Sequence, residues 1–195
     1  MQVPLFPLNT VLFPGGPLPL RIFEPRYVEM VRDCVRDDAP FGVLLIKEGQ
    51  EAGPASTHDV GTLARISDWY QGSDGLLGVT AIGLQRFRVL SSRQEANGLN
   101  VGTIELLPDE PSMPLPAEHE DMSNILGDVL DDLGRLYESL DRHMDEAGWV
   151  TSRFVEILPI DLEHKQRCLE NCDPQERLRL VRELLDAART PVGET

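Results

Sequence analysis

The chain has 195 residues, of which 41% are hydrophobic and 26% are charged, and these values are typical of a globular protein. No stretch approaches the roughly 20 consecutive apolar residues of a membrane helix, and the start lacks the basic region and cleavage site of a signal peptide. We therefore expect a cytoplasmic protein that does not bind membranes. The formal net charge is −15, with 9 basic and 14 acidic side chains in residues 1–110 and 9 and 19 in residues 111–195. This charge argues against nucleic-acid binding, which depends on basic side chains that neutralise phosphates.

The first 22 residues are strongly apolar, but prolines interrupt them repeatedly. Short apolar runs at Val3–Phe6, Val11–Phe13 and Leu18–Ile22 each favour a brief strand. Because proline cannot donate a hydrogen bond to a neighbouring strand, we expect the prolines at strand ends and sheet edges. The glycines of the intervening "PGGP" are typical of a turn with positive φ.

The following segment has the pattern of one helix and a series of strands. Pro25 suits the first turn of a helix, and apolar residues recur at helical spacing to about Asp37. The run "FGVLLIK" at residues 41–47 predicts a buried strand, and the polar residues 49–59 predict a loop. Four more strand-like runs, separated by glycine-containing turns, follow before residue 108. The pattern predicts a small, partly closed β-barrel with one early helix.

A proline-rich segment separates this β-rich part from a helical part. The stretch "PDEPSMPLP" at residues 108–116 carries four prolines and resists regular structure. We therefore expect a β-rich subdomain at 1–110, a linker at 111–117 and an α-helical subdomain at 118–195.

The apolar spacing in the second part predicts helices. Between residues 118 and 145 the apolar side chains fall on one stripe at about 100° per residue, which predicts one long helix. Gly127 and Gly134 would either allow close packing against this helix or weaken it. Shorter helices are predicted at about 149–158 and 162–172, and a last helix begins with Asp173 as its N-cap. The predicted fold class is α+β, with a β pseudo-barrel followed by a helical bundle that contains one long helix.

Several of these motifs together resemble one known family. The stretches "PLFPLNTVLFPGGPLPLRIFEPRYVEMV", "GVLLI", "VGTLARI", "TAIGLQRFRVL" and "SRFVEILPIDLEHKQRCLENCDPQERLRLVRELL" occur in the order found in the Lon protease N-terminal domain, or Lon substrate-binding domain. The resemblance spans nearly the whole chain and implies a PUA-like β pseudo-barrel followed by a helical bundle. It also implies a stand-alone module that recognises unfolded or tagged proteins, because in full-length Lon separate downstream modules hydrolyse ATP and peptide bonds. A P-loop needs Gly-Lys-Ser/Thr, whereas the two lysines, Lys47 and Lys165, follow an isoleucine and a histidine.

The sequence also lacks the common catalytic and metal-binding patterns. The four histidines lie far apart, and no His-Glu-x-x-His, Cys-x-x-Cys or Gly-x-Ser-x-Gly pattern occurs. Cys168 and Cys172 are spaced so that both could lie on one helix face, either as structural thiols or as a metal or redox pair. We expect structural thiols and, with them, no cofactor, no metal and no enzymatic activity.

Charged and aromatic side chains gather around the start of the first helix and in the "GLQRF" run. In a structural interpretation, Glu24 pairs with Arg26 or Arg86 and fixes the helix against the barrel. In a functional interpretation, aromatic side chains beside these charges line a groove for an extended peptide, which the charges orient. These aromatic side chains are Phe23, Tyr27 and Phe87.

The segment "SDWYQGSDG" is a second candidate surface. Trp69 and Tyr70 are adjacent, so in a strand their side chains face opposite sides and we expect one of them to point outward. An exposed aromatic side chain near a hairpin tip would suit contact with a peptide, although it would equally suit an ordinary edge position.

Three functions remain in competition at this point. The first is a non-catalytic module that binds exposed apolar segments of unfolded or partly folded proteins, with an ATP-dependent protease acting in trans as a further partner. The second is a small-ligand sensor with a pocket in or beside the barrel, because clefts at domain junctions are common binding sites. The third, RNA binding, rests on the PUA-like architecture alone. We expect a monomer or a weak homodimer.

Overall fold

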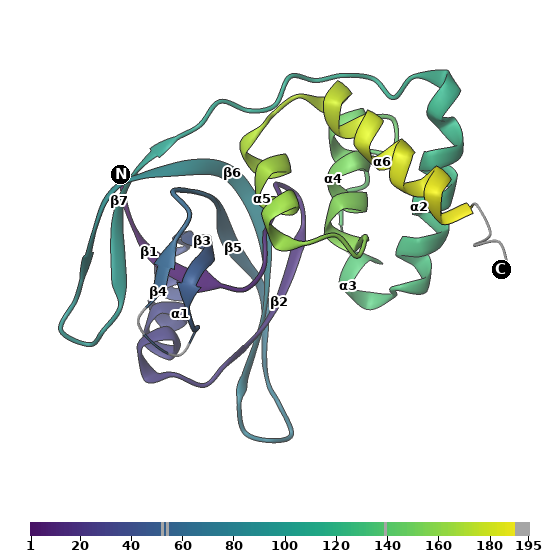
Figure 1. The fold of residues 1–195 in the computed structure, drawn as a ribbon. Coiled ribbons are helices and arrows are strands. Elements are labelled where there is room, and N and C mark those ends of the chain that lie inside the picture. Colours follow the sequence, from purple (N-terminus) through teal and green to yellow (C-terminus); the bar gives the residue numbers. More distant parts are fainter. Residues whose placement is uncertain (52, 54, 139, 190–195) are drawn as a thin grey trace, which may run out of the picture.

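The N-terminal half of the chain forms a β-barrel, and the C-terminal half forms a group of helices beside it (Figure 1). The computed structural model describes residues 1–51, 53, 55–138 and 140–189. The strands are β1 (Gln2–Leu8), β2 (Pro17–Ile22), β3 (Phe41–Gly49), β4 (Ala55–Thr57), β5 (Val60–Gln71), β6 (Leu77–Gln94) and β7 (Asn100–Leu106).

Five of these strands close into a ring. Hydrogen-bonded neighbours follow the order β1-β7-β6-β5-β3, and a parallel pairing of β1 with β3 joins the two ends. The other pairings are antiparallel, with β4 added to β3 and β2 added to β6. A closed ring leaves few open strand edges. The α+β class and the barrel predicted from the sequence are therefore confirmed.

The proline-rich start contains two strands and not three. The segment Val11–Phe13, expected to be a strand, is buried but irregular. Its backbone is held by a side chain and not by strand pairing, since the Thr62 hydroxyl donates a hydrogen bond to the Leu12 carbonyl at 2.5 Å. The side chains of Val11 and Phe13 turn to the core of the helical half. Leu12, between them, packs in the barrel core, an alternation that a strand would also show, but the segment is not part of any strand of the sheet, so the strand prediction was wrong here.

Of two further predictions, the loop at 49–59 holds only in part and the first helix is confirmed. The expected loop at 49–59 contains the short strand β4, while residues 52 and 54 lie outside the described residues. The helix expected from Pro25 to about Asp37 is confirmed as α1 (Pro25–Asp37), and its buried face packs against the core of the barrel.

The helical half consists of η1 (Ala117–His119), α2 (Glu120–Asp132), α3 (Arg135–Glu138), α4 (Ala147–Ile157), α5 (Leu162–Glu170) and α6 (Pro174–Arg189). The single long helix expected over 118–145 is wrong, because the chain breaks between α2 and α3. Gly134 at the break has φ +66°, a left-handed conformation that ends an α-helix. The three later helices are confirmed, and the Asp173 carboxylate accepts the N–H of Gln175 at 2.9 Å as the N-cap of α6.

The barrel and the helices share buried contacts. Val11, Phe13 and Leu45 of the N-terminal half belong to the same apolar cluster as the buried faces of α2, α4, α5 and α6. The Gln166 side chain of α5 also donates to the carbonyl of Val60 in β5 at 2.9 Å. The helices are therefore fixed against the barrel by both apolar packing and hydrogen bonds.

Candidate functional site

An apolar cavity of about 390 Å³ lies between strand β2 and the start of α1. We call it the β2 cavity. Half of its lining residues are apolar and also belong to the barrel core cluster, so the cavity lies against that core. The lining residues are Phe6, Leu8, Thr10, Leu18, Pro19, Leu20, Arg21, Ile22, Phe23, Glu24, Tyr27 and Glu51. The cavity brings together Phe23, Glu24 and Tyr27, three of the residues predicted to form a site.

The charged pair expected at the start of α1 is formed by Glu24 and Arg26. Their carboxylate and guanidinium groups lie 2.8 Å apart, and Arg26 also donates to the carbonyl of Gly98 at 2.9 Å. The guanidinium carbon lies 4.7 Å from the ring centroid of Tyr27, and this ring stacks on Phe6 with 4.0 Å between centroids. Burial raises the pKa of the Tyr27 hydroxyl. These contacts fix one wall of the β2 cavity, while Phe23 remains 62% exposed at its rim.

Trp69 lies on the same face of the sheet as a wall of the β2 cavity, although it does not line the cavity. Trp69 in β5 pairs with Val79 in β6, which in turn pairs with Leu20 in β2. Cross-strand partners point to the same face of a sheet, so Trp69 shares a face with Leu20, which lines the cavity. Trp69 is 60% exposed. It lies toward the tip of the β5–β6 hairpin, which extends away from the barrel (Figure 1).

Tyr70 lies on the opposite face of the same hairpin. It is 55% exposed, so both aromatic residues of the pair are exposed, where the sequence predicted one. Its ring covers Gly78 so closely that a Cβ atom at Gly78 would collide with the ring. The arrangement separates Tyr70 from the β2 cavity.

The remaining two predicted residues, Arg86 and Phe87, are not part of this site. Phe87 is fully buried in a second apolar cluster inside the barrel, so its predicted role in lining a peptide groove is wrong. Arg86 is 7% exposed and turns to the helical half, where it donates to the carbonyls of Leu169 and Pro108 at 3.1 and 2.7 Å. Arg86 therefore connects the barrel to the proline-rich segment that begins at Pro108 and to the end of α5. Of the two arginines predicted to pair with Glu24, Arg26 is the one that does so.

A second cavity, of about 400 Å³, lies at the junction between the barrel and the helices. Residues of the β1–β2 connection, of β6, of the linker and of α4, α5 and α6 line it. Cys168 and Cys172 both face this junction cavity, and burial raises the pKa of both thiols. The thiols are therefore protonated at neutral pH.

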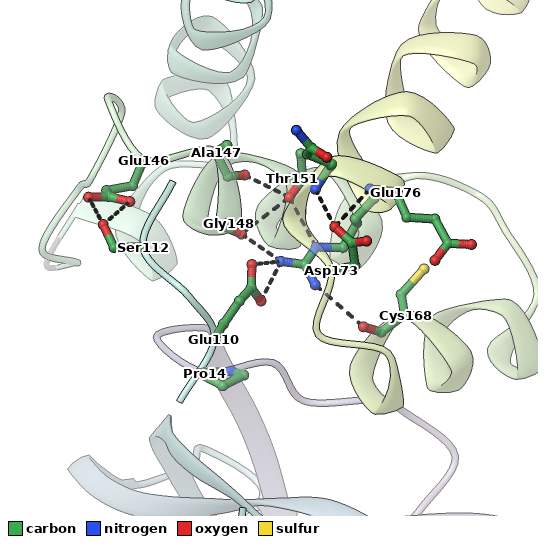
Figure 2. Close-up of polar contacts among 12 residues, drawn as sticks. Pro14, Glu110, Ser112, Glu146, Ala147, Gly148, Thr151, Cys168, Asp173 and Glu176 are labelled. Carbon is green, nitrogen blue, oxygen red and sulfur yellow. Dashed lines mark hydrogen bonds and ion pairs between the residues drawn. The ribbon is translucent and has the colours of Figure 1, made fainter. Parts of the chain in front are cut away.

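Arg177 organises the polar side of the junction cavity. It is 3% exposed and contacts both oxygens of the Glu110 carboxylate at 2.5 and 2.6 Å. It also donates to the Thr151 hydroxyl and to the carbonyls of Gly148 and Cys168. Figure 2 shows how Glu110 of the linker meets the start of α4 and the end of α5 through these contacts. The sequence analysis missed Arg177, although it precedes the buried Val181 by four residues and so shares its helix face.

A buried ion pair lies on another side of the same junction. Arg153 is fully buried, and its guanidinium donates to the Glu156 carboxylate at 2.8 Å and to the carbonyl of Pro14 at 3.0 Å. Burial raises the pKa of Glu156 to about 7, although Arg153, the N–H of Phe13 and Lys165 lower it. The carboxylate also lies against Gly16, where a Cβ atom would collide with it. This pair ties α4 to the β1–β2 connection.

Two further properties concern the described residues as a whole. Within residues 1–51, 53, 55–138 and 140–189, there is no group of three or more His, Cys, Asp or Glu side chains with a geometry that could hold a metal ion. No helix in the described part of the chain is both long and apolar enough to cross a lipid bilayer.

Comparison with solved structures supports the architecture described above. The chain matches the crystal structure of a Lon N-terminal domain protein from Xanthomonas campestris with a TM-score of 0.74 and 36% identity, over 98% of this chain and 99% of that one. The N-terminal domain of a Lon protease from the Mycobacterium avium complex has the same fold, with a TM-score of 0.61 at 15% identity.

Comparison with known sequences gives relatives that are much longer than this chain. Lon protease 2 of Myxococcus xanthus is 29% identical over 96% of this chain, but the match covers 24% of that protein. Protein cereblon of Xenopus tropicalis is 36% identical over 59% of this chain and 26% of its own length. The chain thus spans about a quarter of the curated relatives that it matches. The family model of the ATP-dependent protease La (LON) substrate-binding domain matches residues 2–187. This match covers nearly the whole chain, which therefore belongs to the Lon substrate-binding domain family.

Proposed function

We propose that this chain is a non-catalytic, cytoplasmic recognition module that binds exposed apolar segments of unfolded or partly folded proteins. The β2 cavity, together with Phe23 and Trp69, would form the binding surface. Membership of a substrate-binding domain family supports this proposal. Its main structural support is an apolar cavity with the exposed Phe23 at its rim and the exposed Trp69 on the same face of the sheet.

The dimensions of the site fit an apolar side chain of a client protein. A volume of about 390 Å³ lies within the range of about 300–1,000 Å³ that is usual for ligand pockets. Burying one large apolar side chain contributes about 1.5–3 kcal/mol, so a segment with two or three such side chains would gain about 3–9 kcal/mol before the cost of association is subtracted. Exposed aromatic residues at the rim are the kind of side chain that dominates binding free energy in protein interfaces.

Titration of a fluorescently labelled, permanently unfolded protein tests this proposal. We expect saturable binding, and we expect Phe23→Ala and Trp69→Ala each to raise the Kd about 5- to 30-fold. Leu90→Ala is the matched control, because Leu90 is also a large apolar residue, 61% exposed, and does not line the β2 cavity. Absence of binding at high micromolar concentration, or equal losses in all three variants, would count against the proposal.

The longer relatives suggest a later step, after a client has bound. The relatives that match nearly the whole chain are Lon proteases, of which this chain spans about a quarter. We propose that an ATP-dependent protease acts on the bound client. Adding such a protease to the client with and without the chain would test this, and an unchanged rate of degradation would contradict it.

The junction cavity supports a second candidate function, binding of a small ligand. Two buried arginines, two thiols and the indole of Trp149 converge on a space of about 400 Å³ between the two halves of the chain. A ligand that binds there would stabilise the contact between the halves. A thermal-shift screen of metabolites tests this candidate, and a hit should lose its effect when Ser152, which lines the cavity, is replaced by the larger Leu. A flat response across a broad library would contradict it.

A further inference from the structure

We infer that the β2 cavity selects client segments in which Lys or Arg lies next to the apolar residues. This inference rests on the proposed function and specifies the chemistry of the client. Its basis is that the cations at the site are already paired with carboxylates, whereas the Glu51 carboxylate on the cavity wall has no cationic partner among the described residues.

Both arginines at the site have their charge neutralised by this chain. Arg21, which lines the β2 cavity, forms an ion pair with Asp74 at the tip of the β5–β6 hairpin. Arg26 pairs with Glu24, donates to the carbonyl of Gly98 and lies over the ring of Tyr27. A client carboxylate would have to displace these partners before it could bind either guanidinium.

Glu51 is the carboxylate of the cavity wall without a cation. It lines the cavity and accepts the backbone N–H of Asn9 at 2.6 Å. It has no cationic group within 4.0 Å in the described part of the chain. Asp68 does not belong to this site, because it lies on the opposite face of β5 from Trp69, as Tyr70 does. A carboxylate that accepts one N–H retains lone pairs for further donors, such as an ammonium or guanidinium group.

The charge of the whole chain acts in the same direction. A net charge of −15 attracts cationic segments and repels acidic ones during diffusion, and this long-range effect falls with ionic strength. The Glu51 carboxylate adds local specificity, because it lies on the wall of the cavity in which an apolar anchor would be seated. The occupant that satisfies both features is an extended segment with a large apolar anchor flanked by basic residues.

Three synthetic peptides test the inference. They share a central Leu-Trp-Phe-Leu core and differ only in their flanks, which carry lysines, glutamines or glutamates, and the Kd of each is measured by fluorescence anisotropy at low and high salt. We expect the lysine-flanked peptide to bind about fivefold more tightly than the glutamine-flanked peptide at low salt, because an exposed ion pair contributes up to about fivefold and the Glu51 carboxylate is available. The glutamate-flanked peptide should bind most weakly, and high salt should reduce all differences.

Two single variants separate the local carboxylate from the overall charge. In Glu51→Gln the preference for the lysine-flanked peptide should fall to about twofold. Glu105→Gln removes the same charge from an exposed position that does not line the cavity, and it should keep the preference. Equal loss in both variants would overturn the local site and leave only a net-charge effect.

Peptide binding by the wild-type protein alone also distinguishes failure of the charge inference from failure of the proposed function. If the lysine-flanked and glutamine-flanked peptides bind equally, the charge inference is wrong and the proposed function stands. If none of the three peptides binds, the proposed function is wrong, and the charge inference falls with it.

Discussion

At the scale of single residues, Arg177 has the largest number of polar contacts at the junction. It contacts the linker through Glu110, α4 through Thr151 and Gly148, and α5 through Cys168. Replacing it by Met removes the partner of a largely buried carboxylate, and breaking such a pair costs about 3–5 kcal/mol. We expect Arg177→Met to lower the free energy of unfolding by about this amount in urea denaturation. Arg179→Met, at an exposed position two residues further on, should change it by less than about 0.5 kcal/mol.

Equal effects of the two arginine substitutions would contradict this role for Arg177. The contrast also explains why the sequence analysis did not find the residue. A basic side chain in a helix is usually exposed. The charge of the buried Arg177 is compensated by Glu110, which lies 67 residues away in the chain, so the sequence around Arg177 gives no sign of its burial.

Glu156 provides a pH-dependent prediction. Its pKa rises from 4.5 to about 7 on folding, so between these values the folded protein holds a proton that the unfolded chain has released. Stability therefore falls as pH rises from about 4.5 to about 7, by up to about 3 kcal/mol from this group. The charged and titratable groups around it are Arg153 on its own helix, Lys165 of α5 and Tyr137 of α3.

Glu156→Gln isolates this effect from the other carboxylates. Gln does not titrate, so the difference in unfolding free energy between wild type and variant should shift in favour of the variant from pH 4.5 to pH 7.5. Urea denaturation at several pH values measures this difference. A constant difference over that range would show that Glu156 does not titrate there.

At the scale of elements, two glycines in the helical half have opposite roles. Gly134 has φ +66° at the break between α2 and α3, so Gly134→Ala should destabilise by about 1–2 kcal/mol through backbone strain alone. Gly127 lies inside α2, where a Cβ atom would meet the terminal methyl of Met144 at an ordinary 3.5 Å. Gly127→Ala should therefore stabilise by about 0.5–1 kcal/mol. Thermal denaturation of both variants measures the contrast, and a change of the same sign in both would contradict the assignment of the break.

These glycines also show what the sequence could and could not predict about elements. The apolar stripe over residues 118–145 continues past Gly134, so periodicity alone gave one helix where the chain forms two. Runs of alternating apolar residues predicted most strands and the barrel, because their spacing depends on local geometry. The segment Val11–Phe13 is buried, as a strand would be, but its backbone is irregular, and an apolar run alone does not distinguish these two cases. Local pattern thus predicts elements, but not the long-range contacts that bend or bury them.

The candidate site shows the same limit. The sequence singled out Phe23, Glu24 and Tyr27 around the start of α1 as candidates, and the structure places them at one cavity. It could not show that Phe87 points into the barrel or that Arg86 points to the helices, since both depend on how the sheet closes. Glu51 and Arg21, which line the same cavity, were missed because they become neighbours of Tyr27 only through tertiary folding.

At the scale of the whole molecule, the shared core predicts that the barrel and the helices unfold together. Val11, Phe13 and Leu45 bury their side chains among the helices, so the helical core is incomplete without the N-terminal half. Arg86, Arg153 and Gln166 add polar contacts across the same junction. An interface of this kind couples the two halves, because neither half can open without exposing apolar side chains of the other.

A matched pair of valine substitutions tests this coupling by native-state hydrogen exchange. Val43 lies in the barrel core and Val150 in the helical core, and both are at most 2% exposed. Each Val→Ala change should cost about 2 kcal/mol, from lost burial and the cavity left behind. If the halves unfold as one unit, Val43→Ala lowers the exchange free energy of the most protected amides of α4 as much as those of β3. Val150→Ala should likewise lower the exchange free energy of the most protected amides of β3 as much as those of α4. A loss confined to the substituted half would show that the halves unfold independently, and the junction cavity could then open without unfolding of either half.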